Sequence, residues 1–289
     1  MNNTLRTTVL LAALTGLIVW LGQMLGGAQG ALFAFVLAAA MNAGSYWFSD
    51  RIVIAMYRGR EIQESDDPEL FGVVRSLAQR LRVPMPKLYV LPTESPNAFA
   101  TGRNPEHAAV AVTFGIRRLL DRRELEGVLA HEMAHVTNRD ILISSIAATL
   151  AGAIMMLANM ARWAMIFGAG QRDERDNGGG AFTLLLTVIL APIAAMLIQM
   201  AISRSREFQA DDTAARLTRD PEGLALALSK IAGYAERVPL PASPQTAHLF
   251  IVNPLRASAL KSLFSTHPPI EQRVARLREI AAQLGQVAR

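Results

Sequence analysis

The segment His131-Glu132-Met133-Ala134-His135 places two imidazoles four residues apart, with a carboxylate beside the first. On a helix, positions i and i+4 share one face, so both rings can bind a single zinc ion. Glu132 then lies next to the open position of that metal. This spacing predicts the zinc site of a hydrolase.

The helix that carries the motif is marked at its start and along one face. Asp121 and Glu124 have the spacing of a capping box. An apolar stripe follows at intervals of three and four residues, formed by Leu125, Leu129, Met133 and Val136. The two histidines lie on the adjacent stripe, where a metal would be half buried. The alternative is a pair of histidines on the solvated face of an amphipathic helix.

Two histidines do not complete a catalytic zinc site, which usually has three protein ligands and one exchangeable water. The metzincin pattern would need a further histidine at a position that Ile141 occupies. The remaining histidines are His107, His248 and His267, and the other common third ligand is a glutamate on a second helix. Glu207 is the best candidate for that glutamate.

Asp211 lies one helical turn after Glu207 and on the same face. It is placed to accept the free N–H of a ligating imidazole, which fixes the tautomer and strengthens the ligand. The alternative is an exposed Glu/Asp pair near a helix end. The chain contains no cysteine, so any zinc must be held by nitrogen and oxygen atoms.

Four motifs together resemble the HtpX membrane metalloproteases, relatives of the CAAX prenyl endopeptidases. They are His131-Glu132-x-x-His135, Asn138-Arg139-Asp140, Glu207-Phe208-x-Ala210-Asp211 and Thr266-His267-Pro268-Pro269. The resemblance covers nearly the whole chain, including its hydrophobic segments. It implies Glu207 as third zinc ligand, a gluzincin-like fold, peptide-bond hydrolysis and a quality-control role toward damaged membrane proteins.

The resemblance also implies a catalytic role for His267, which would reach the cleft and donate to the tetrahedral oxyanion as charge develops there. Arg273 is a weaker candidate for the same contact with the substrate. The alternative is that His267 is an ordinary residue before the helix that Pro268 and Pro269 open and that runs to Leu284.

Hydrophobic residues make up 51% of the chain, which is high for a soluble protein with 6% aromatic residues. Four apolar segments contribute, at residues 7–25, 31–48, 143–167 and 181–203. An uncharged, glycine-rich turn separates the first two, which predicts a transmembrane hairpin. Polar residues and a proline interrupt the second pair, so buried helices of a soluble domain remain an alternative there.

Arginines indicate the orientation of these segments. The turn between the first two has none, whereas Arg51, Arg58 and Arg60 follow the second segment and Arg204 and Arg206 follow the fourth. This distribution predicts cytoplasmic termini and a cytoplasmic active site in a multi-pass protein of the bacterial inner membrane. A cleaved signal peptide at the start of the chain would reverse that orientation.

The chain therefore divides into four parts. Residues 1–50 form a transmembrane hairpin, 51–142 a cytoplasmic part with the two histidines, 143–203 a second hairpin, and 204–289 a cytoplasmic part with the third ligand. The second hairpin has both ends on one side of the membrane, so it returns Glu207 to the histidines.

Strand-like runs at residues 87–91, 97–102 and 108–113 predict a small sheet. The expected fold is predominantly α with this sheet, in a polytopic membrane protein. In gluzincin-like proteases an exposed edge strand pairs with the substrate backbone, which makes Asn97 and Phe99 candidates for substrate binding. The alternative for this run is an ordinary turn.

The expected activity is that of a zinc metalloendopeptidase with one Zn²⁺ per chain and Glu132 as general base. Its expected partners are membrane proteins or unfolded polypeptides and the lipid bilayer. Although the net charge is +5, no basic run is interleaved with aromatic residues, so nucleic acid is not expected. A membrane scaffold and a metal transporter stay open, but neither needs a carboxylate beside His131. The oligomeric state is left open.

Overall fold

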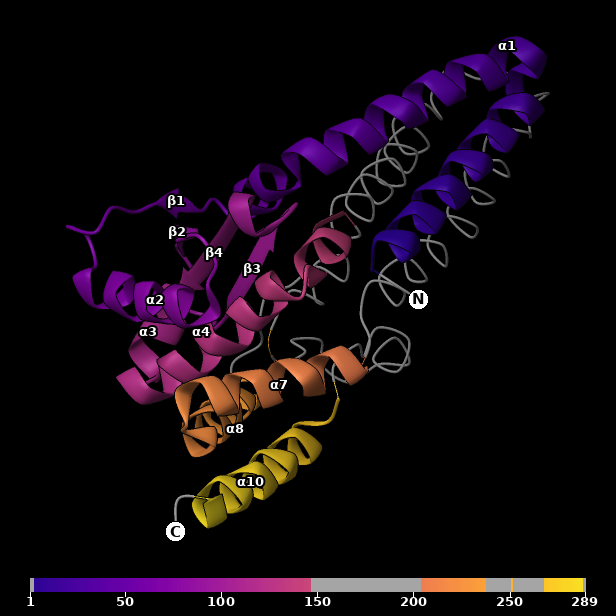
Figure 1. Ribbon diagram of the computed structural model, residues 1–289. Helices are drawn as coiled ribbons and strands as arrows, with labels where there is room; N and C mark the ends of the chain where they lie inside the picture. Colours follow the sequence, from indigo (N-terminus) through magenta and orange to yellow (C-terminus); the bar gives the residue numbers. More distant parts are fainter. Residues whose placement is uncertain (1–2, 147–203, 238–250, 252–267, 288–289) are drawn as a thin grey trace.

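The computed structural model describes residues 3–146, 204–237, 251 and 268–287. It is mostly helical with one small mixed sheet, which confirms that part of the predicted fold class. A long pair of helical arms projects from a body in which helices pack around the sheet (Figure 1). The N-terminus lies at the end of the first arm, and the C-terminus lies beyond α10 (Ile270–Val287), at the far side of the body from the tip of the arms (Figure 1).

The first helix, α1 (Asn3–Met56), doubles back on itself within the predicted turn (Figure 1). Gly27 has a positive φ of 55° at this point, a conformation that glycine adopts without strain. The amide of Asn42 on one arm donates to the hydroxyl of Thr15 on the other, at 2.9 Å. The second arm continues beyond the predicted end at residue 48 and joins the body.

Among the residues that the structure describes, Gly27–Met56 is long and apolar enough to cross a membrane. Many of its large side chains are exposed, among them Leu32 and Phe33 at 66% and 72%. The predicted segments at 143–167 and 181–203 lie outside the described residues, apart from 143–146, which are helical. The second hairpin therefore stays a prediction.

The sheet has four strands in the order β1-β2-β4-β3. They are β1 (Arg60–Glu61), β2 (Lys87–Leu91), β3 (Ala98–Gly102) and β4 (Ala108–Thr113). The β2 and β4 strands are parallel, whereas β1 and β3 pair antiparallel with their neighbours. The three predicted strands agree with this sheet to within one residue, and β3 lies at its edge.

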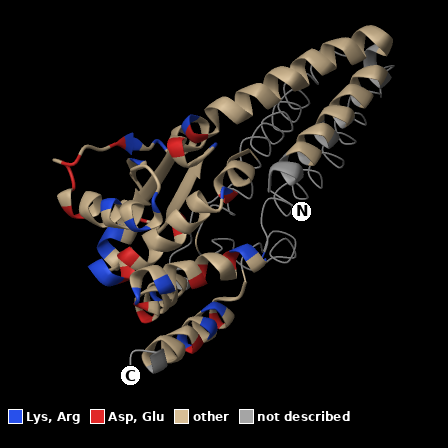
Figure 2. Ribbon diagram, viewed as in Figure 1, with Lys and Arg blue, Asp and Glu red and all other residues tan. Residues whose placement is uncertain are grey.

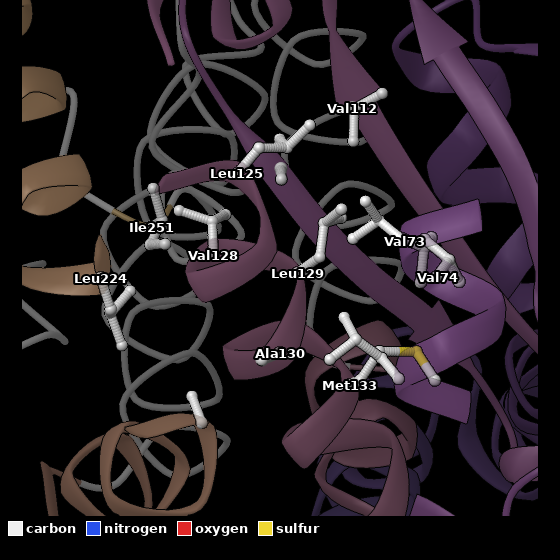
Figure 3. Close-up of a cluster of buried hydrophobic side chains, with 14 of the residues drawn as sticks. Val73, Val74, Val112, Leu125, Val128, Leu129, Ala130, Met133, Leu224 and Ile251 are labelled. Carbon is white, nitrogen blue, oxygen red and sulfur yellow. The ribbon is translucent and has the colours of Figure 1, made fainter. Parts of the chain in front are cut away.

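The core is organised around α4 (Arg122–Thr137), the helix that carries both histidines. Figure 3 shows Leu125, Leu129 and Met133 lying toward the sheet and α2 (Pro68–Leu81), while Val128 lies toward Leu224 and Ile251. All six side chains are buried, so the predicted apolar stripe does face the core. Burial on two sides fixes the rotation of α4 about its axis.

The remaining helices complete this packing. They are the short α3 (Phe114–Leu119), α7 (Arg204–Thr218), α8 (Pro221–Arg237) and α10 (Ile270–Val287), with the 3-10 turn η1 (Pro105–His107) between β3 and β4. Helices α7 and α8 pack on α4, and α10 packs on both of them. The chain after residue 203 therefore returns to the helix of the two histidines.

The crossing of α4 and α8 generates a prediction on stability. A Cβ on Gly127 would lie 2.9 to 3.1 Å from the backbone and Cβ of Leu224, so Gly127→Ala should force the helices apart and destabilise the fold by about 1–3 kcal/mol. The control is Gly72→Ala in α2, where nothing lies within 4 Å, and alanine should stabilise the helix by about 0.5–1 kcal/mol. Thermal unfolding in detergent measures both. Equal melting temperatures for the two variants would contradict the close approach of α4 and α8.

Candidate metal centre

The helix of the two histidines is fixed at its N-terminus. The Asp121 carboxylate accepts from the Glu124 N–H, and the Glu124 carboxylate accepts from the Asp121 N–H, so the predicted capping box is present. Glu124 also lies 2.7 Å from Nζ of Lys230 on α8. Because α4 is capped, buried and tied to α8, the directions of its histidines are set by the fold.

The side chains of His131, His135 and Glu207 direct atoms that could bind a metal toward one another. Nε2 of His131 lies 3.3 Å from Nε2 of His135 and 3.6 Å from Oε2 of Glu207, and His135 Nε2 lies 3.5 Å from Oε1 of Glu207. A tetrahedral metal with bonds of 2.0–2.1 Å has its ligand atoms about 3.3 Å apart. The separations fit such an ion, and the group can hold a metal.

The centre is nearly closed to solvent. The His131 and Glu207 side chains are 1% and 6% exposed, whereas His135 is 15% exposed. An isolated buried carboxylate would be unfavourable, so Glu207 at this depth requires cationic or protonated neighbours. A divalent cation between the three side chains meets that requirement.

Each imidazole has a carboxylate behind it. His131 Nδ1 lies 2.9 Å from Oδ1 of Asp211, and His135 Nδ1 lies 3.2 Å from Oδ2 of Asp140. When Nδ1–H donates to a carboxylate, the lone pair of Nε2 points toward the centre of the site. Asp211 therefore lies where its predicted role requires.

Asp140 was not predicted to have a role from its spacing. The chain turns after α4 through Arg139, whose φ is 57°, and this turn brings Asp140 back against His135. Arg206 Nη1 donates to its other oxygen at 3.3 Å. The one sequence feature that could have pointed to Asp140 was its place in the Asn-Arg-Asp motif. Helical spacing could not place it, because this motif lies just after the end of α4.

Arg273 lies behind Asp211 and is fully buried. Its Nε and Nη2 donate to the two carboxylate oxygens at 2.8 and 2.7 Å, a bidentate pair, and Nη1 donates to the carbonyl of Ile251 at 3.2 Å. Burial alone would raise the pKa of Asp211, but the charge and hydrogen bonds of Arg273, with those of His131, hold it at about 2. Asp211 is therefore charged at neutral pH.

The electrostatics around His131 favour a cation. Burial and the positive charge of Arg273 lower its pKa, but hydrogen bonds to Asp211 and Glu207 outweigh them and raise the pKa to about 9. The same carboxylates that stabilise a proton on this ring would stabilise a metal ion next to it. A metal that binds His131 must displace that proton.

Glu132 is held by the edge strand rather than by the three donor atoms. Its Oε2 accepts from the N–H of Ala100 on β3 at 3.0 Å, and the residue is 7% exposed. Burial raises the pKa of Glu132, although the nearby His131 and His135 oppose that shift. The carboxylate is therefore positioned beside the centre with an increased affinity for a proton.

The structure corrects the predicted substrate-binding role of three side chains. Asn97, Phe99 and Arg273 are 1%, 2% and 0% exposed. The side-chain oxygen of Asn97 accepts from the N–H of Ile251 at 3.1 Å, and the Phe99 ring packs 5.7 Å from the ring of Tyr57, which directly follows α1. Phe99 lies on β3, both faces of which are covered, and Asn97 directly precedes this strand and is equally buried, so neither side chain can reach a substrate.

The other histidines are placed differently. His107 is exposed at η1, where Nδ1 contacts the side chain of Asn104, and it is not part of the centre. His248 and His267 lie outside the described residues, so the catalytic role of His267 stays a prediction.

Residues 64–281 match the model of Peptidase family M48. A Protease HtpX homolog of Syntrophobacter fumaroxidans is 58% identical over 97% of this chain and 100% of its own length. A second, from Syntrophotalea carbinolica, is 60% identical over 96% of this chain and 99% of its own. A third, from Pyrococcus furiosus, is 54% identical over 97% of this chain and 96% of its own.

The crystal structure of S. mikatae Ste24p is similar with a TM-score of 0.50 and 18% sequence identity. The match covers 95% of this chain but 65% of Ste24p, so the chain spans just under two thirds of that protein. At this identity the likeness concerns the fold alone.

The contact between Asp140 and His135 generates a prediction on metal affinity. Asp140→Asn removes the negative charge behind the imidazole, and metal affinity should fall by about 10–100-fold. The control is Asp212→Asn, which removes a carboxylate that pairs with Arg216 on the outer face of α7. Zinc titration against a chromophoric chelator measures both affinities. A normal affinity in the Asp140 variant would show that His135 is oriented without it.

Proposed function

This chain belongs to peptidase family M48, and within it to the HtpX proteases, and on that premise we propose that it is a zinc-dependent endopeptidase of a membrane. The observation that carries the proposal is the convergence of His131, His135 and Glu207 beside the buried carboxylate of Glu132. A ligand site without catalysis has no use for that fourth side chain.

The donor set supports zinc as the metal. Two imidazole nitrogens and one carboxylate oxygen are the ligands of many catalytic zinc sites, in which a fourth position stays open. His135 is the most exposed of the three side chains, and we place the open position on its side. Zinc bound by these residues would supply Lewis-acid chemistry, which activates water and polarises a carbonyl group.

Glu132 performs the proton transfers in the proposed reaction. It takes a proton from the attacking water as the new carbon–oxygen bond forms, and it gives this proton to the nitrogen as the peptide C–N bond breaks. The products are a carboxylic acid and an amine. The raised pKa of Glu132 suits both steps, because the group must accept and then release a proton near neutral pH.

The edge strand β3 offers a way to hold the substrate backbone. The N–H of Thr113 donates to the carbonyl of Asn97, so the alternate residues, among them Ala98 and Ala100, direct their backbone groups away from β4. We propose that the substrate pairs with this edge as an added strand, which fits many sequences because the contacts are to main chain. The N–H of Ala100 is already donated to Glu132, and Ala98 and Ala100 are 0% and 6% exposed, so this pairing requires the groups that cover the edge to move aside. The hydroxyl of Ser145 accepts from the N–H of Gly102 and limits the edge at that end.

The membrane location rests on α1. Its second arm is apolar enough to span a bilayer, and arginines follow it, which supports a cytoplasmic position for the peptidase body. We extend the proposal to a multi-pass protein of the inner membrane, with residues 143–203 as a second hairpin. Its substrates would then be misfolded or damaged membrane proteins, cut at the cytoplasmic face as part of a stress response.

The catalytic carboxylate provides the first test of this function. Glu132→Gln should retain zinc and the fold while hydrolysis of casein in detergent falls at least about a hundredfold, the usual scale for loss of a general base. Glu126→Gln is the matched control, because Glu126 lies on the same helix in a surface ion pair with Arg80. Normal cleavage by the Glu132 variant would contradict the mechanism, and zinc-free wild type would indicate a scaffold.

Topology provides the second test. Reporters fused after Arg60, near Asp121 and after Ala215 should all face the cytoplasm, whereas reporters at Gly27 and at Gly178 should face the opposite side. One metal ion can bind His131, His135 and Glu207 only if an even number of crossings separates them. Reporters near Asp121 and Ala215 on opposite sides would exclude the proposed centre.

A further inference from the structure

A cavity of about 590 Å³ lies where α1 meets the sheet, and it shares no lining residue with the metal centre. Trp47, Phe48 and Arg51 of α1 line one side of it. The other side consists of residues from β2, η1 and the start of β4, together with Arg103, which lies between β3 and η1. The cavity therefore lies between the apolar arm and the peptidase body.

The cavity lies at the level where the apolar arm ends. Figure 2 shows no charged residue on the second arm of α1 until its junction with the sheet. In the sequence, Asp50 and Arg51 are the first charged residues after Gly27. Just before that point Tyr46, Trp47 and Phe48 are 38%, 54% and 50% exposed. Exposed tryptophan and tyrosine at the end of an apolar helix are typical of the membrane–water interface.

Two guanidinium groups lie against these aromatic rings. Arg103 stands 4.6 Å above the Trp47 ring, and its Nη1 donates to the Trp47 carbonyl at 3.4 Å. Arg51 lies 5.9 Å from the centre of the Phe48 ring. Stacking on a ring face holds a guanidinium group while most of its N–H groups stay available to an acceptor.

Neither arginine forms a salt bridge with any of the residues that the structure describes, although Asp50 and Glu106 also line the cavity. The third cation of the lining, Lys87, lies 3.3 Å from a carboxylate oxygen of Glu61. Arg51 and Arg103 are therefore the two cations of this cavity that can bind an anion.

We infer that this cavity binds the phosphate of an anionic phospholipid headgroup. Arginine matches the geometry of phosphate oxygens, and basic pockets beside a membrane span bind anionic lipids. A lipid fits better than free phosphate, because the exposed rings of Trp47 and Phe48 offer an apolar wall to the glycerol and the first acyl carbons. The inference rests on the proposed membrane position of α1.

Such a site has a mechanical consequence. Its cations come from two parts of the chain, since Arg51 belongs to α1 and Arg103 follows β3. A headgroup bound by both would tie the edge strand of the sheet to the membrane surface. The height of the peptidase body above the bilayer would then depend on the lipid that occupies the cavity.

The test uses the full chain with Trp20→Phe and Trp163→Phe, so that Trp47 is the sole tryptophan. It is reconstituted into phosphatidylcholine vesicles that contain an equal fraction of either brominated phosphatidylglycerol or brominated phosphatidylcholine. Quenching of Trp47 should indicate at least about fivefold enrichment of phosphatidylglycerol, the scale of one arginine beside an anionic surface. The Arg51→Gln/Arg103→Gln variant should quench equally with both lipids.

The matched control is Arg75→Gln/Arg118→Gln, which removes the same charge from exposed ion pairs with Glu64 and Glu94. It should keep the preference. The headgroup site would be overturned if both lipids quenched Trp47 equally in the chain that keeps Arg51 and Arg103. It would also be overturned if the control variant lost the preference for phosphatidylglycerol to the same extent as the Arg51/Arg103 variant.

Inorganic phosphate separates the two sources of the anion. At equal ionic strength it should reduce the preference no more than chloride does, and a selective reduction by phosphate would assign the cavity to a soluble anion instead. Absence of quenching by either brominated lipid would contradict the membrane position of α1, and with it the proposed function, rather than the headgroup site alone.

Discussion

The metal centre depends on a chain of buried charged groups that runs from Arg273 through Asp211 to His131. Arg273 holds Asp211 in a bidentate pair, and Asp211 holds Nδ1 of His131, so that Nε2 of the imidazole faces Glu207. Removing one partner of a buried pair destabilises a protein by about 3–5 kcal/mol, because the other charge remains uncompensated. Helix α10 is therefore part of the centre, although no metal ligand lies on it.

The same constraint explains the packing around α4. Its ligands must meet a glutamate from α7 while its own face packs against the sheet and α8, and Gly127 permits that close crossing. Glu132 is fixed from the opposite direction by the N–H of Ala100. The edge strand thus positions the carboxylate that we propose as the general base.

Local patterns predicted much of this structure. The capping box at Asp121, the apolar stripe of α4 and the three strands depend on neighbouring residues, and all are present. The resemblance to the HtpX proteases is confirmed by the family match and the relatives. The convergence of Glu207 on α4 was predicted from the resemblance to that family and from a second hairpin that returns the chain to the histidines, whereas helical spacing predicted only that Asp211 shares a face with Glu207.

The remaining features depend on tertiary packing that spacing does not encode. Asp140 reaches His135 through a turn with positive φ at Arg139. The sequence suggested that the polar side chains of Arg273 and Asn97 were available to a substrate. Both are buried instead: Arg273 donates to Asp211 and to the carbonyl of Ile251, and Asn97 accepts from the N–H of Ile251. Phe99 is covered by Tyr57 at the base of α1, a contact between segments far apart in the sequence.

The most direct test of the account is X-ray absorption at the zinc edge, with metal analysis, on the purified chain and on its Glu207→Ala variant. The account predicts one zinc per wild-type chain, with two imidazole nitrogens and further oxygen ligands at about 2.0–2.2 Å. It predicts that the variant loses most of its zinc. A variant that retains full zinc with unchanged coordination would contradict the claim that Glu207 completes the site with His131 and His135.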